Sequence, residues 1–328
     1  MTERSTREGR RALLFVAGLL CAVVAAVTAG CGDRGGEAPA PGELAGTADS
    51  SDPGASPGPT IWVDAAGDTL ELDASPERIV ALVPSVTRVI SELGEAARLV
   101  GRTRYDTATA LAELPSVGAG MGPDYEALLA LRADLVVYFV GASDPETPAQ
   151  LERLGLRRFG VRPDNLDDVV GLYGTFGGML GQPERGEALV ASLEATLDSV
   201  ARAVASSDAS LGVAYLIDGD PPWAAGPATY IGQLVELAGG TLLPTDLPPL
   251  YAPISPESLV RAEIDVILLS GGSDIDARLA EGRRIERVPN WVEVPGPEVR
   301  DAAWVIAEAL HPALSRAPSP RSSPGGAP

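Results

Sequence analysis

The stretch Pro183–Ala205, with the sequence PERGEALVASLEATLDSVARAVA, decides the fold of this chain. Apolar residues recur along it at the spacing of one helical face, at Leu189, Leu193, Leu197, Val200 and Val204. As an α-helix the stretch would be roughly 34 Å long, about the width of a small domain. It predicts a strut between two lobes; an ordinary surface helix of a single domain is the alternative interpretation.

Two similar segments flank this helix, and each alternates short apolar runs with helical patterns. Arg78–Val83 and Asp134–Val140 are apolar runs before it, and Leu211–Ile217 and Asp265–Ser270 follow it. Such alternation is typical of parallel sheets covered by helices. The sequence therefore predicts an α/β fold with two Rossmann-like lobes, residues 60–182 and 207–311, joined by one long rigid α-helix over residues 183–206.

The boundaries of several elements can also be predicted. Ile61–Val63 and Leu70–Leu72 should form a hairpin around Ala66-Gly67-Asp68. Ser85 is expected to be the N-cap of the helix that follows Pro84. Further helices are predicted over Asp124–Leu131, Pro148–Leu154, Asn165–Leu180, Tyr230–Ala238, Ser255–Ala262 and Gly296–His311.

The N-terminus is typical of an exported protein. A basic start leads into an apolar stretch, Ala12–Ala29, which ends in Ala29-Gly30-Cys31. This ending resembles the processing site of bacterial lipoproteins, although Thr28 stands where that pattern prefers Leu. We therefore expect a signal peptide over residues 1–31 with lipid attached to Cys31, which anchors the protein to a membrane outside the cytoplasm; an uncleaved anchor is the alternative. Residues 32–59 and 312–328, rich in Gly, Pro and Ser, are expected to be a disordered tether and tail.

Composition excludes several classes of function. The formal net charge is −20, and all 25 basic residues are Arg. An acidic surface repels nucleic acid, and the lack of Lys removes P-loop and Schiff-base chemistry. Of the two Cys, Cys21 lies in the apolar signal and Cys31 at its end. The body therefore has no disulfide and no Cys-based metal or nucleophile site.

Two stretches in opposite lobes match each other. Asp124–Val136 and Ser255–Ile267 each begin with an N-cap residue, carry a Glu two places later, at Glu126 and Glu257, and an Asp eight places further on. The lobes are therefore expected to be topological relatives. Each Glu could simply favour the positive end of its helix dipole, worth roughly 0.3–1 kcal/mol. Alternatively, the two could form a symmetric pair of contacts to a two-fold partner with basic pockets.

The chain resembles the substrate-binding lipoproteins of ABC importers for cobalamin and iron–siderophores, the class III periplasmic binding proteins. The resemblance runs from about Pro76 to Leu310 and is carried by PERIVALVPSVT (76–87), LVGRTRY (99–105), the two Glu helices, PPW (221–223), LVELAGG (234–240) and GPEV (296–299). It implies two lobes on one rigid helix that move little on binding. It also implies that Glu126 and Glu257 dock onto Arg pockets of the membrane permease, and that the protein is a monomer.

Aromatic residues gather in the loops expected to face the crevice between the lobes. Flat rings suit a broad planar ligand such as a corrin, although each ring could instead pack in a core. The predicted ligand-binding residues are Tyr105, Met121, Phe139, Trp223, Tyr251, Asn290 and Trp291. The resemblance implies that Trp223 packs on the ligand and that Asn290-Trp291 matches an Asp-Trp pair near its edge. Gly120-Met121 stands where cobalamin binders have a Trp. A corrinoid is therefore expected, with a ferric siderophore or haem as the alternative.

Enzyme activity is not expected. The glycines of Gly118–Gly122 lack the spacing of a dinucleotide loop, there is no G-x-S-x-G motif, and His311 is the only His. We predict no catalytic residue, no metal site and no resident cofactor, although the ligand itself would carry cobalt or iron. An accessory or sensor protein on the same fold is the remaining alternative.

Overall fold

The computed structural model describes residues 59–205, 207, 210–272, 275 and 277–314, all within the unit Ser56–Pro328. The expected signal peptide, Cys31, almost all of the tether and most of the tail lie outside the described residues.

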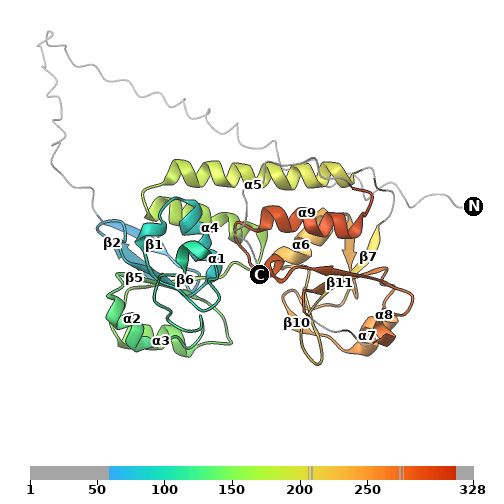
Figure 1. The fold of residues 1–328 in the computed structure, drawn as a ribbon, viewed down its shortest axis with the longest axis horizontal. Helices are drawn as coiled ribbons and strands as arrows, with labels where there is room; N and C mark the ends of the chain where they lie inside the picture. The colour runs from blue at the N-terminus through green and yellow to red at the C-terminus, as the bar shows by residue number, and fades with distance from the viewer. Residues whose placement is uncertain (1–58, 206, 208–209, 273–274, 276, 315–328) are drawn as a thin grey trace, which may run out of the picture. The chain divides into compact units, whose positions relative to one another are not determined.

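The N-terminal lobe is built on a four-stranded parallel sheet (Figure 1). The antiparallel hairpin β1 (Thr60–Val63) and β2 (Thr69–Leu72) precedes it, as predicted. The sheet has the order β4-β3-β5-β6, where the strands are β3 (Ile79–Ala81), β4 (Leu99–Gly101), β5 (Leu135–Phe139) and β6 (Arg158–Val161). Its helices are α1 (Pro84–Glu92), α2 (Tyr125–Leu131), α3 (Glu146–Arg153) and α4 (Leu166–Met179), with 3-10 turns at Ala96–Arg98 and Thr109–Leu111.

The long helix α5 (Pro183–Val204) contributes to the cores of both lobes. Near its start Leu189 and Val190 pack against the N-terminal core. Further along, Leu193, Val200 and Val204 belong to the C-terminal core. The helix packs on α4 of the first lobe and on α6 and α9 of the second (Figure 1). One apolar face thus serves two cores, which makes the helix the predicted connection between the lobes.

The C-terminal lobe holds a six-stranded mixed sheet. Strands β7 (Leu211–Ile217), β9 (Gly240–Leu242), β11 (Val266–Ser270) and β12 (Arg284–Val288) are parallel. The short strand β8 (Trp223–Ala224) pairs antiparallel with the end of β7, and β10 (Ala252–Pro253) pairs antiparallel with β8. Its helices are α6 (Tyr230–Leu237), α7 (Pro256–Arg261), α8 (Ala277–Ala280) and α9 (Val299–Leu310), with a 3-10 turn, η3, at Asn290–Glu293.

The parallel strands follow the same order in both lobes. The order is β4-β3-β5-β6 in the N-terminal lobe and β9-β7-β11-β12 in the C-terminal lobe. When the parallel strands are counted along the chain, the second strand lies on one side of the first, and the third and fourth lie on its other side. Helices α2 and α7 each precede the third strand of their lobe. The predicted α/β fold with two related lobes is confirmed, and α2 and α7 are equivalent elements.

The matched Asp residues explain part of the internal similarity. Asp134 donates its backbone N–H to the carbonyl of Arg78 (2.8 Å), and its carboxylate accepts from the N–H groups of Glu77 and Arg78. Asp265 makes the same two-sided pairing with the backbone of Gly212, with a carboxylate distance of 2.7 Å. In both lobes the Asp directly precedes the third parallel strand, and its hydrogen bonds join this point to the start of the first parallel strand.

Three predicted helix starts are wrong, among them that of α3, which begins at Glu146 rather than Pro148. Helix α1 begins at Pro84, its N-cap is Val83 without a side-chain cap, and Ser85 lies buried inside the first turn. Helix α9 begins at Val299 rather than Gly296. A Cβ on Gly296 would lie 3.3 Å from the Cβ of Ser85, so this segment is held against α1 before the helix can start.

Candidate functional site

The two lobes meet at the carboxyl ends of their parallel strands. Because open α/β sheets bind ligands outside the carboxyl ends of their strands, the region between the lobes is the candidate ligand site, which we call the crevice. Asp164, which follows β6, accepts a hydrogen bond from the backbone N–H of Tyr230 at the start of α6 (2.7 Å). The N–H of Leu166 donates to Oε1 of Gln233 on α6 (2.8 Å). The described contacts between lobes thus include the loop after β6 and the first turns of α6.

A second contact between lobes joins α1 to the start of α9. Arg88 Nη1 lies 2.5 Å from Glu298 Oε1, and Arg300 forms an ion pair with Glu92. Tyr173 on α4 donates its hydroxyl hydrogen to Glu92 Oε2 (2.7 Å). Burial, and then the nearby Glu92 carboxylate, raise the pKa of Tyr173 well above its usual value. We call this set of side chains the α1–α9 junction.

Several polar atoms of α1 and of the start of α9 are buried without a partner among the described residues. They are Ser85 Oγ, Thr87 Oγ1, Glu298 Oε2 and Arg300 Nη1. Buried polar groups normally have a hydrogen-bond partner in the protein or in ordered water. The junction can therefore take up hydrogen bonds from water or from a polar group of a ligand.

Three of the predicted ligand-binding residues lie in the N-terminal lobe. Tyr105 is 54% exposed, and the guanidinium of Arg104 lies 5.2 Å from its ring centre and donates to its hydroxyl (3.2 Å). Met121 is 56% exposed, with its sulfur 3.8 Å from the hydroxyl of Ser143. Phe139 ends β5 and packs partly buried against the N-terminal core. Tyr105 and Met121 thus offer free surface, whereas Phe139 is largely a packing residue.

The other four lie in the C-terminal lobe. Trp223 is 44% exposed and pairs in the sheet with Ile217 and Pro253. Tyr251 directly precedes β10, the strand that pairs with β8, so the two residues lie on neighbouring segments of the chain fold. In η3, Asn290 is exposed, whereas Trp291, like Tyr251, packs partly buried against the C-terminal core. All four come from loops and short strands near the carboxyl ends of β7 and β12.

A buried polar cluster beside these rings was missed by the sequence analysis. The hydroxyl of Tyr215 lies 3.5 Å from Glu293 Oε1, and the hydroxyl of Tyr230 donates to the carbonyl of Val292 (3.0 Å). Burial raises the pKa of Glu293, and hydrogen bonds from Ser270 and Tyr215 oppose this shift. Tyr251 adjoins the cluster, and burial also raises its pKa. The available signal was a Tyr near the carboxyl end of an otherwise aliphatic strand.

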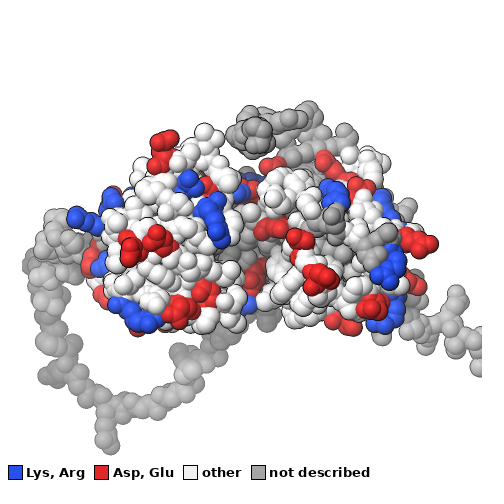
Figure 2. Space-filling model, turned by 60° about the horizontal axis from the view of Figure 1, so that its bottom comes forward, with Lys and Arg blue, Asp and Glu red and all other residues white. Residues whose placement is uncertain are grey.

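The two acidic residues predicted to dock lie at equivalent places. Glu126 and Glu257 each occupy the second position of their helix, after the N-caps Asp124 and Ser255. Both are exposed, and neither has a side-chain partner among the described residues. Helices α2 and α7 lie at the end of each lobe away from α5 (Figure 1), and Figure 2 shows acidic side chains on this side of both lobes.

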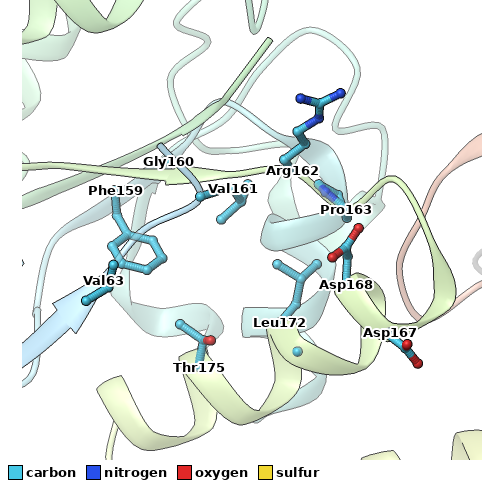
Figure 3. Close-up of a pocket in the computed structure, with 12 residues that line it drawn as sticks. Val63, Phe159, Gly160, Val161, Arg162, Pro163, Asp167, Asp168, Leu172 and Thr175 are labelled. Atoms are coloured by element: carbon cyan, nitrogen blue, oxygen red, sulfur yellow. The ribbon is translucent and has the colours of Figure 1, made fainter. Parts of the chain in front are cut away.

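Two cavities in the N-terminal lobe are separate from this crevice. One of about 220 Å³ lies between β1, β6 and α4, with Phe159, Leu172 and Thr175 around it (Figure 3). Of its charged groups, Arg162 pairs with Asp164, and Asp168 belongs to the capping box of α4. The other, of about 300 Å³, lies beside α3 and includes Phe139. Both are small for a macrocycle, since ligand pockets span roughly 300–1,000 Å³.

The described residues contain no cluster of His, Cys, Asp or Glu that could hold a metal ion. His311 ends α9 and places Nε2 2.7 Å from the carbonyl oxygen of Ala238, which ends α6. Within the same residues no helix is both long and apolar enough to cross a membrane.

Comparison with known proteins gives consistent matches. A family model described as periplasmic binding protein matches residues 79–290. The cobalamin-binding protein of Halobacterium salinarum is 28% identical over 276 residues, which cover 77% of this chain and 74% of the relative. A periplasmic heme-binding protein of Pseudomonas aeruginosa is 25% identical with a TM-score of 0.66 and covers 75% of this chain and 96% of its own. The vitamin B12-binding protein of Vibrio cholerae has a TM-score of 0.62 at 21% identity, covering 72% and 97%, which shows a shared fold.

Proposed function

Because the chain belongs to the periplasmic binding protein family, we propose that it is the extracytoplasmic binding component of an ABC importer, and that it captures a corrinoid between its lobes and delivers it to the permease. Relatives named for cobalamin or vitamin B12 support the ligand class. The role is binding and delivery, without chemistry on the ligand. Lipid on Cys31 would hold the protein at the membrane.

The exposed rings at the carboxyl ends of the strands carry this proposal. Tyr105 and Trp223 are both about half exposed, on opposite lobes, although aromatic side chains usually bury most of their area. With Met121 they offer broad apolar surface at low entropic cost. Such a surface suits a wide, flat ligand with an apolar face.

Haem is the alternative ligand that a specific observation favours, because two solved structures at 25% identity are named as heme-binding proteins. The only His of the chain is held by the carbonyl of Ala238. On the proposed ligand surface, the exposed side chains of a type that binds haem iron are the phenol of Tyr105 and the thioether of Met121. A ferric siderophore is a further alternative, because a structural neighbour named for Fe3+-hydroxamate transport shares the fold. An accessory role without ligand is the last alternative.

A fluorescence titration tests the proposal. The chain without residues 1–31 is titrated in parallel with cobalamin, cobinamide, haem and a ferric siderophore, and tryptophan emission is followed. We expect saturable quenching by the corrinoids at sub-micromolar concentration. Binding of haem or ferric chelate alone would reassign the ligand, and no binding of any of them would favour the accessory role.

Two variants locate the binding surface. Trp223→Phe should remove most of the quenching, because its indole is expected to lie against the ligand. Trp62→Phe is the matched control: Trp62 is on β1 and packs near Gly178, away from the crevice. If the ligand quenches the tryptophan emission of both variants equally, Trp223 does not lie against the ligand.

A further inference from the structure

Few large apolar side chains are exposed on the described part of the chain, and they are unevenly distributed. Eight are exposed in all. Tyr105, Met121 and Trp223 belong to the proposed ligand surface. Ile61 and Val63 lie on β1, and Leu154 follows α3. The remaining two are Leu129, 45% exposed, and Val260, 52% exposed.

Leu129 and Val260 occupy equivalent positions in the two lobes. Each follows the N-cap of its helix by five residues, Asp124 in α2 and Ser255 in α7. Each also directly follows a fully buried leucine, Leu128 or Leu259, which anchors the other face of the helix in its lobe. The shared helix–strand geometry and the matching Asp134 and Asp265 contacts make this equivalence structural.

In each helix the exposed aliphatic side chain lies three residues after the exposed acid. Residues at this spacing are neighbours on one helix face. Glu126 with Leu129, and Glu257 with Val260, therefore form two similar patches, each a carboxylate beside an aliphatic side chain. We call them the paired patches.

We propose that the paired patches form one bipartite docking surface for a two-fold symmetric membrane partner, in which each half of the partner seats a basic side chain on the Glu and an aliphatic pocket on Leu129 or Val260. The inference rests on the proposed function and extends it from a charge contact to a contact with an apolar centre. A repeated patch on related lobes fits a partner with two equivalent halves. Desolvation by the apolar contact strengthens the adjacent ion pair, because the interaction of charges rises as the local dielectric falls.

Photo-crosslinking tests which partner covers the patches. A photoreactive phenylalanine derivative is placed at position 129, 260 or 61 of the full chain, in cells that take up the ligand. We expect positions 129 and 260 to give adducts with the same membrane subunit, identified by mass spectrometry, and position 61 to give none; Ile61 is the control because it is 65% exposed on β1. The proposal would be overturned if the adducts contained a second copy of this chain or only lipid. It would also be overturned if only one of the two positions, or neither, gave an adduct.

A double variant separates this inference from the proposed function. Leu129→Asn/Val260→Thr should bind the ligand within about twofold of the parent, because neither residue lies in the crevice, whereas uptake should fall at least tenfold. Ile61→Thr is the control and should leave uptake unchanged. If the parent binds no ligand, the proposed function fails. If the double variant binds normally and also transports normally, the paired patches are not a docking surface.

Discussion

At the scale of single residues, burial changes how Glu293 responds to pH. Burial raises the pKa of Glu293, so the folded protein holds the proton more tightly than the unfolded chain does. Its stabilising contribution is therefore present at low pH and is lost as the pH rises through the native pKa. Among the described residues, its polar contacts are with the hydroxyl groups of Tyr215 and Ser270 rather than with a basic side chain.

Replacing Glu293 with Gln should remove this dependence. We expect the Tm of Glu293→Gln to match the parent near pH 4 and to exceed it by roughly 1–4 °C at pH 7.5, since about 1 kcal/mol shifts Tm by 2–4 °C in a chain of this size. Differential scanning fluorimetry across this pH range measures the difference. The control is Glu187→Gln, which changes an exposed carboxylate of α5; its Tm should differ from that of the parent by the same amount at every pH. A similar pH trend in both variants would contradict the assignment to Glu293.

Individual side chains of the site were only partly predictable from the sequence. Trp223 and Tyr251 stand out because they lie among Pro-rich loops, where a ring has little core to join. Tyr230 could be expected near the crevice as one of several aromatic residues, but its cluster with Tyr215 and Glu293 could not, because this cluster forms only when β7, α6 and η3 pack together. Such a cluster has no spacing in the sequence to indicate it.

At the scale of elements, the end of α2 carries local strain. Arg132, its C-cap, has φ 48° and is the non-glycine residue with positive φ among those described. The left-handed conformation costs a non-glycine residue about 1–2 kcal/mol, part of which is offset by the lower entropy of the unfolded chain.

We therefore expect Arg132→Gly to raise the free energy of unfolding by about 0.5–1 kcal/mol. The control is Arg261→Gly, at the end of α7 where the backbone is helical, which should lower it by about 1 kcal/mol. Urea unfolding followed by circular dichroism measures both changes. A destabilised Arg132→Gly would show that the guanidinium has a role that its backbone conformation does not reveal.

Elements with strong local patterns were predictable, and those made by tertiary pairing were not. The apolar periodicity of α5 and the capping residues Asp124, Asn165 and Ser255 predict their helices to within about two residues. β8 and β10 have two residues each and exist only through their pairing with each other and with β7. β12 (RIERV) carries three charged residues, so it lacks the apolar run of a buried strand.

At the scale of the whole molecule, delivery should depend on charge at the paired patches. Replacing Glu126 and Glu257 together with Arg should leave ligand affinity within about twofold and abolish uptake, because basic pockets would meet like charge. The control Glu187→Arg/Glu194→Arg makes the same charge change at exposed positions of α5. Uptake measured with labelled ligand should be lost only in the first variant, and normal uptake there would exclude a docking role for these carboxylates.

The α1–α9 junction should determine how firmly the lobes are held together. Replacing Glu92 and Glu298 with Gln leaves Arg300 and Arg88 without their carboxylates in a half-buried contact, and we expect a loss of about 1–3 kcal/mol. Hydrogen exchange should accelerate in α1 and α9 but not in α2 or α7, because α5 still serves both cores. The control Glu146→Gln breaks an ion pair with Arg153 in which both side chains are more than half exposed, and such pairs contribute about 0–1 kcal/mol. Equal losses in the two variants would mean that the junction is only a surface contact, and that α5 and the hydrogen bonds between the loop after β6 and α6 set the relation between the lobes.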